Sequence, residues 1–192
     1  MPLWGNSTSD ESRPKWLRED DKPANNLNEC FADERGWVIK HADGNEEVIV
    51  AIGGLAGAGT TNVGLGNATI VKVYFTSTGF STSTYGTFVE VLYNEKVDVQ
   101  GGAATLVVDG SVSGAGAFVG YAVTTAGDNK VGFAFTTTAT AETLTIPGQT
   151  IAGIITDTST SVASDKVFVS TEVSGAGPTG PAGLTTTATV AP

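Results

Sequence analysis

Apolar residues recur in short runs from residue 68 onward, with glycine, aspartate and asparagine between the runs. Within the second run, Val89, Val91 and Tyr93 alternate with other residue types, which is the period of a strand that has one inward face. This pattern is typical of an antiparallel β-sandwich, and it predicts no helix of ordinary length over residues 68–175. The expected strands are Ile70 to Phe75, Thr87 to Tyr93, Ala104 to Val108, Phe118 to Val123, Val131 to Phe135, Leu144 to Ile146, Ile151 to Ile155 and Val167 to Val169.

A separate pair of strands is predicted ahead of this sandwich. The apolar runs Trp37 to Ile39 and Val48 to Ile52 flank an Asp43-Gly44 dipeptide. Asp-Gly is a strong hairpin indicator because glycine accepts a positive φ. Residues 36–52 are therefore expected to form a β-hairpin, and the glycine-rich stretch up to residue 67 is expected to be a linker.

The two ends of the chain have a different character. Residues 1–35 show no sustained period and mix prolines with polar and charged residues, which predicts an extended arm. Residues 176–192 include two collagen-like Gly-Pro triplets, which are too few for a triple helix, so we expect an extended C-terminal tail. The whole chain is thus predicted to be all-β, with an arm, a hairpin, a sandwich and a tail.

Two apolar pairs interrupt the polar arm. Large aromatic residues in a segment that does not fold alone commonly anchor it to a partner. We therefore expect partner-binding residues in the arm, and the alternative is that the tryptophans fold back onto the chain's own β domain. The expected residues are Leu3, Trp4, Pro14, Lys15, Trp16 and Leu17.

Charge and composition exclude some partners. The chain has a net charge of -10, divided equally between residues 1–50 (6 basic, 11 acidic) and the remaining 142 residues (4 basic, 9 acidic). Nucleic-acid binding needs clustered Lys and Arg, so no nucleic-acid partner is expected. No stretch approaches the roughly 20 apolar residues of a membrane span, and no secretory signal is recognisable at Met1. The single cysteine rules out an intramolecular disulfide, which fits folding in a reducing cytoplasm.

The residues that carry catalysis or bind metals are sparse. His41 has no second His or Cys nearby, Cys30 is expected to be a small apolar filler, and Trp37 is expected in the core. The glycines after Ile52 lack the Lys-Ser/Thr of a phosphate-binding loop. Five carboxylates could gather as calcium ligands at one end of the sandwich, but the ligand spacing is absent and surface solubility is the better explanation. We therefore expect no enzyme activity, no cofactor and no metal. The five are Glu95, Asp98, Asp109, Asp128 and Asp157.

Three motifs within residues 69–173 carry a resemblance. They run from Phe88 to Val99, from Ala104 to Gly110 and from Ile151 to Asp157. This stretch resembles the bacterial Ig-like repeats of the swimming-protein type, which are adhesion and display modules. The resemblance implies an Ig-like sandwich. The family's Asp-x-x-Gly-Asn turn has no counterpart over residues 159–164, so the resemblance assigns no ion- or turn-related role there.

A second resemblance lies near the start of the chain. Met1 to Asn6, Lys15 to Leu17 and Cys30 to Val38 resemble the opening of virion structural proteins from contractile-tailed phages of marine cyanobacteria. Together the resemblances imply a capsid decoration protein on the virion surface, assembled in the host cytoplasm. Its arm would bind the major capsid protein or other virion subunits, and its Ig-like domain would be displayed outward as a homo-oligomer or lattice-bound multimer.

Two alternatives remain open. One is a neck, baseplate or tail-fibre subunit, in which the Ig-like domain acts as a spacer. The other is a carbohydrate-binding adhesin that recognises a host-surface glycan. The adhesin hypothesis requires several tyrosines to share an exposed face, and the candidates are Tyr74, Tyr85, Tyr93 and Tyr121.

Overall fold

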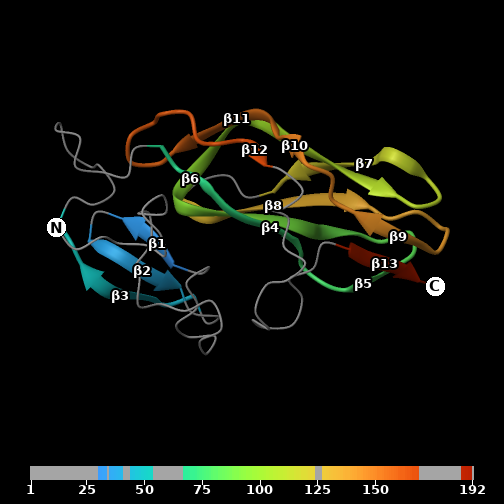
Figure 1. The fold of residues 1–192 in the computed structure, drawn as a ribbon, viewed down its shortest axis with the longest axis horizontal. Coiled ribbons are helices and arrows are strands. Elements are labelled where there is room, and N and C mark those ends of the chain that lie inside the picture. The colour runs from blue at the N-terminus through green and yellow to red at the C-terminus, as the bar shows by residue number, and fades with distance from the viewer. Residues whose placement is uncertain are drawn as a thin grey trace.

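The computed structural model describes residues 30–33, 35–40, 44–53, 67–123, 127–168 and 187–191, which form an all-β, sandwich-like fold (Figure 1). These residues contain no helix. The strands are β1 (Cys30–Asp33), β2 (Gly36–Lys40), β3 (Glu46–Ala51), β4 (Ile70–Phe75), β5 (Gly79–Ser81), β6 (Tyr85–Gly110), β7 (Gly114–Ala122), β8 (Asp128–Thr136), β9 (Glu142–Thr145), β10 (Gln149–Thr150), β11 (Ala152–Asp157), β12 (Val167–Phe168) and β13 (Thr187–Ala191).

Strand β6 organises the sandwich because its two halves pair with different neighbours. The first half lies between β4 and β8, and the second half pairs with β7 and β9. Strand β11 pairs with β6 from Val97 to Thr105, where the two halves join. Strand β7 also pairs with β8, so the sheet curves back toward itself. A single long strand therefore contributes to both sides of one core.

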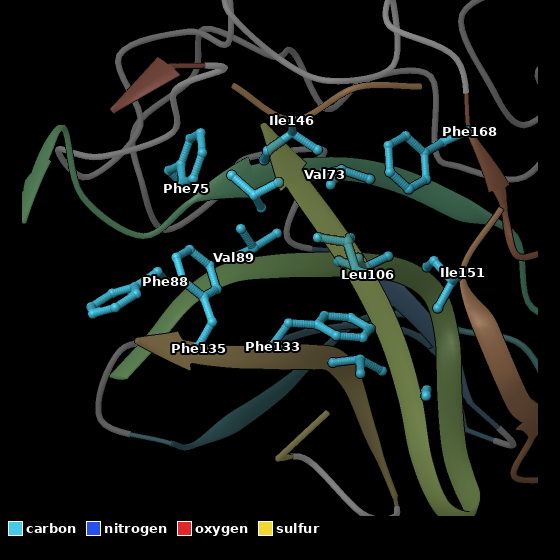
Figure 2. Close-up of a cluster of buried hydrophobic side chains, with 14 of the residues drawn as sticks. Val73, Phe75, Phe88, Val89, Leu106, Phe133, Phe135, Ile146, Ile151 and Phe168 are labelled. Atoms are coloured by element: carbon cyan, nitrogen blue, oxygen red, sulfur yellow. The ribbon is translucent and has the colours of Figure 1, made fainter. Parts of the chain in front are cut away.

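The core of the sandwich is apolar and is filled from both halves of β6. Val89 from the first half and Leu106 from the second half belong to the same buried cluster. Figure 2 shows these two side chains together with Phe133 of β8 and Val73 of β4. Four phenylalanine rings continue the cluster, with centroid separations of 6.0 Å (Phe75–Phe80), 4.3 Å (Phe80–Phe88) and 5.1 Å (Phe88–Phe135). Burial of large aromatic side chains of this kind contributes strongly to stability.

A smaller three-stranded sheet, formed by β1, β2 and β3, lies at one end of the sandwich (Figure 1). Trp37 and Cys30 are buried in its own apolar cluster, as the sequence predicts. The small sheet joins the sandwich where β1 pairs with β6 at Ala32 and Glu95. Two ion pairs cross the same junction, between Lys96 and Glu46 (3.1 Å) and between Lys40 and Asp128 (3.0 Å).

Several predicted elements are confirmed. Strand β4 has the predicted bounds, and β2 and β3 form the expected hairpin with Gly44 at φ 87°. The linker over residues 54–66 lies outside the described residues.

Three predictions need correction. The strands expected at residues 87–93 and 104–108 are parts of the continuous β6, because the polar stretch between them is paired with β8 and β11. Residues 30–33, assigned to the arm, form β1 because Phe31 and its neighbours are buried. Residues 187–191, assigned to the tail, form β13, which pairs with β9 and β5 and buries Ala188 and Val190 in the core.

Candidate partner-binding surface

The partner-binding residues predicted in the arm cannot be placed. Leu3, Trp4, Pro14, Lys15, Trp16 and Leu17 all lie outside the described residues, as does His41. The described residues contain one other candidate surface, on the sandwich.

One exposed face of the sandwich gathers uncharged side chains from β6, β7 and β8. The register places Tyr121 of β7 and Thr87 of β6 on either side of Ala134 of β8, so the three side chains share one face. Tyr85 pairs with Thr136 two residues further along the same face. Together with Val119 of β7 and with Val123, which follows β7, these residues form a surface that we call the tyrosine face. It consists of Tyr85, Thr87, Val119, Tyr121, Val123 and Thr136.

The large side chains of the tyrosine face are exposed to solvent. Tyr85 is 66% exposed and Tyr121 is 55% exposed, and Val119 of β7 and Val123 just after it are also exposed. Ala134 is nevertheless buried, so its larger neighbours cover it. Tyrosine combines a broad apolar ring with a polar hydroxyl, and for this reason it is common at protein interfaces. Contiguous exposed apolar side chains mark interaction sites more often than isolated ones do.

The exposure of the four candidate tyrosines shows which of them can share an accessible face. Tyr74 and Tyr93 are buried, at 5% and 0% exposure, so they do not contribute to an exposed face. The hydroxyl of Tyr74 donates to Glu90 (2.7 Å), and that of Tyr93 donates to the backbone carbonyl of Asp165 (3.1 Å). The hydroxyl of each buried tyrosine is thus hydrogen-bonded inside the protein. Only Tyr85 and Tyr121 of the four share an accessible face.

The sequence pattern alone assigns no site to Thr87, Val119, Val123 or Thr136. The alternation of Val119, Tyr121 and Val123 with smaller or aromatic inward residues was readable in the sequence, and it indicates an outward apolar stripe. The partnership of β7 with β6 and β8 was not readable, because strand pairing is a long-range property.

The five carboxylates weighed as calcium ligands do not form a cation site among the described residues. Asp98 accepts hydrogen bonds from Thr158 (2.9 Å) and Gly127, Asp109 accepts one from Gly116, and Asp128 pairs with Lys40. Glu95 and Asp157 are each only 1% exposed, so surface solubility is the wrong explanation for these two. Within the described part of the chain, no group of three or more His, Cys, Asp or Glu side chains is placed to hold a metal ion.

Asp157 organises a turn over residues 157–164. The backbone N–H of Asp157 donates to Val162, and that of Ser161 donates back to Asp157. Ser161 adopts a positive φ of 58°, a region that glycine or asparagine usually occupies. A turn is therefore present here although the glycine-containing motif of the Ig-like family is absent.

Comparisons of the chain with protein-family models, with curated proteins and with solved structures find no match. The part of the chain that the structure describes has no helix long and apolar enough to span a membrane.

Proposed function

We propose that this chain is a non-enzymatic virion structural protein, and specifically a capsid decoration protein whose Ig-like domain is displayed outward. The observation that supports outward display is the tyrosine face, an exposed surface on paired strands that stays free for a second partner while the arm holds the capsid. The assignment to a virion depends on the resemblance of the leader at Met1 to Asn6 and Cys30 to Val38 to phage structural proteins. The protein is assembled in the host cytoplasm and is held on the particle as an oligomer or lattice-bound multimer.

In this proposal the arm attaches the protein to the capsid. Trp4 and Trp16, with Leu3, Pro14, Lys15 and Leu17, insert into the major capsid protein or another virion subunit. Aromatic residues buried at the centre of an interface commonly contribute about 2 kcal/mol or more each. Many copies of a modest arm contact gain further strength through effective concentration.

The junction between the small sheet and the sandwich supports this arrangement. The arm leads directly into β1, which pairs with β6 through its backbone. The ion pairs of Lys96 with Glu46 on β3 and of Lys40 on β2 with Asp128 on β8 hold the rest of the small sheet to the sandwich. Phe31 lies under Lys96, with the ammonium 5.3 Å from the ring centroid. An anchored arm would therefore fix the position of the sandwich relative to the capsid surface.

Co-sedimentation with expanded empty capsids tests the proposal. The full-length chain is expected to pellet near stoichiometry with the capsid subunits, and a Trp4→Ala/Trp16→Ala variant is expected to lose most of this binding. A Tyr85→Ser/Tyr121→Ser variant is the matched control, because two aromatic residues are removed from the outward face, and it should pellet like the wild type. If the full-length chain stays in the supernatant, the capsid assignment fails, and a low copy number in purified tails would favour a neck, baseplate or fibre subunit.

A second candidate function is a carbohydrate-binding adhesin, which the shared exposed face of Tyr85 and Tyr121 favours. Aromatic rings present an apolar surface and a hydroxyl, both of which suit a sugar ring. Glycan-array binding by the full-length chain, lost in the Tyr85→Ser/Tyr121→Ser variant, would support this function. The full chain is needed because β13 belongs to the core. Absence of glycan binding by the wild type would count against it.

A further inference from the structure

Two carboxyl groups are buried next to each other where β6 meets β11. Tyr93 and Val97 of β6 both belong to the apolar core, so Glu95 between them also points inward. Asp157 at the end of β11 is directly opposite Val97, which places it diagonal to Glu95 on the same face. Each of the two acidic side chains is 1% exposed.

The two carboxyl groups are held very differently. Asp157 Oδ1 accepts four hydrogen bonds, from the backbone N–H of Ser159 (2.8 Å) and of Thr160 (2.7 Å) and from their two hydroxyls (2.6 and 3.0 Å). Such a set of donors stabilises the ionised form of a carboxyl group. Oδ2 of Asp157 and both oxygens of Glu95 are buried and have no hydrogen-bond donor among the described residues. A proton carried by Glu95 would provide the missing donor.

The charged groups on the surrounding elements do not neutralise Glu95. Lys96 is directed to Glu46 and Phe31, and Lys40 pairs with Asp128. Lys72 of β4 is opposite Leu92, which alternates with Tyr93 and so faces the other side of β6. The packed elements also carry Cys30 and Asp33 on β1, Tyr93 and Asp98 on β6, Lys130 on β8, and Asp165 and Lys166 beyond the turn, where Lys166 donates to the carbonyl of Gly153. Tyr85, Glu90 and Asp109 lie farther along β6.

The two buried carboxyl groups are more stable with one proton between them than with both groups ionised. Burial and the negative charge of Asp157 raise the pKa of Glu95 to about 8. Two ionised carboxylates this close in a nonpolar interior are strongly unfavourable, because neither has water to solvate it. The route to water is through the turn, since Thr158, Ser159 and Ser161 are exposed.

We propose that Glu95 and Asp157 share one proton and that its loss to solvent in mildly alkaline solution opens the turn at residues 157–164. Opening releases the hydrogen bonds from Ser161 to Asp157 and from Ser164 to Ile155 and exposes both carboxylates to water. The pair is thus a pH-sensitive device, separate from the tyrosine face and independent of the virion assignment.

Hydrogen exchange of the amides of Ser161 and Ser164 tests the opening. After correction for the intrinsic pH dependence of exchange, protection in the wild type is expected to fall about tenfold or more between pH 6 and pH 9. Glu95→Gln keeps the shape and supplies a permanent donor, so its protection should stay flat. Glu142→Gln, which changes a different buried carboxylate, should show the wild-type fall. An equal fall in Glu95→Gln would overturn the proposal.

A direct titration of the wild type needs no variant. The carboxyl carbon-13 shift of Glu95 is expected to titrate near pH 8. Asp157→Asn retains an oxygen for Ser159 and Thr160 and offers an N–H to Glu95, so the titration should move to lower pH. Titration of Glu95 near its usual value of 4.5 in the wild type would refute a shared proton.

Discussion

At the scale of single residues, Glu142 shows how local donors fix a charge inside this fold. Its carboxylate accepts hydrogen bonds from the backbone N–H of Val112 (3.1 Å) and Ser113 (3.0 Å) and from the hydroxyls of Ser113 (2.7 Å) and Thr138 (2.9 Å). Burial acts to raise the pKa of Glu142, but these hydrogen bonds outweigh it and lower the pKa to about 2. The side chain thereby holds the turn between β6 and β7.

We predict that Glu142→Gln destabilises the fold by about 1–3 kcal/mol at pH 7, because charge-assisted hydrogen bonds are lost. The folded pKa lies below the unfolded value, so this stabilisation is present above about pH 4.5 and is lost as the pH falls toward 2. In urea unfolding, the difference in the free energy of unfolding between the wild type and Glu142→Gln should be smaller at pH 3 than at pH 7. Glu47→Gln, at an exposed position of β3, should change stability by less than about 0.5 kcal/mol at either pH.

Glu95 gives the opposite pH dependence. Its folded pKa of about 8 lies above the unfolded value of 4.5, so its protonated form is favoured by folding. The associated stability is complete below about pH 4.5 and is lost as the pH rises through 8. Glu142 therefore makes the stability of the fold decrease in acid, and Glu95 makes it decrease in alkaline solution.

At the scale of elements, the small sheet depends on the glycine that begins β2. Gly36 has a φ of 130°, and a Cβ there would overlap the backbone carbonyl of Val50 on β3. Gly44, in the β2–β3 turn, also has a positive φ (87°), but it faces open space. Substitution of Gly44 therefore measures only the cost of the positive φ, whereas substitution of Gly36 adds the cost of a steric clash.

We predict that Gly36→Ala costs about 2–4 kcal/mol and that Gly44→Ala costs about 1 kcal/mol, since only the first adds a clash with backbone that cannot move away. Trp37 fluorescence during urea unfolding of a Trp4→Phe/Trp16→Phe background would report on the small sheet. Equal losses for the two variants would contradict the steric argument.

The elements also show how far the sequence predicts the fold. Alternation and the Asp43-Gly44 turn predict β4 and the hairpin because these depend on local preferences. Asn94 to Lys96 has the polarity of a turn, yet β8 and β11 pair beyond it and extend β6 through it. The shared face of Tyr85 and Tyr121 requires the register of three strands, which no local pattern contains. The burial of Glu95 beside Asp157 has the same origin.

At the scale of the whole molecule, the C-terminal strand completes the sandwich. Strand β13 pairs with β9 over four residues and with β5 over three. It therefore lies between β9 and β5 in the sheet. Ala188 and Val190 belong to the same buried cluster as core residues of β4, β6 and β8. The final segment of the chain therefore contributes to the same cooperative unit as β6.

Truncation after residue 186 is therefore predicted to destabilise the fold by about 3 kcal/mol or more, because it removes backbone pairing from β9 and β5 and opens the core. Val190→Ala should cost about 1–3 kcal/mol through the lost methyl groups alone. Thr189→Ala, at the exposed position beside it, should cost less than about 0.5 kcal/mol. Denaturant unfolding of the three variants would check this order. If truncation left the midpoint and slope of unfolding unchanged, β13 would not belong to the cooperative core, and the sandwich would end before residue 187.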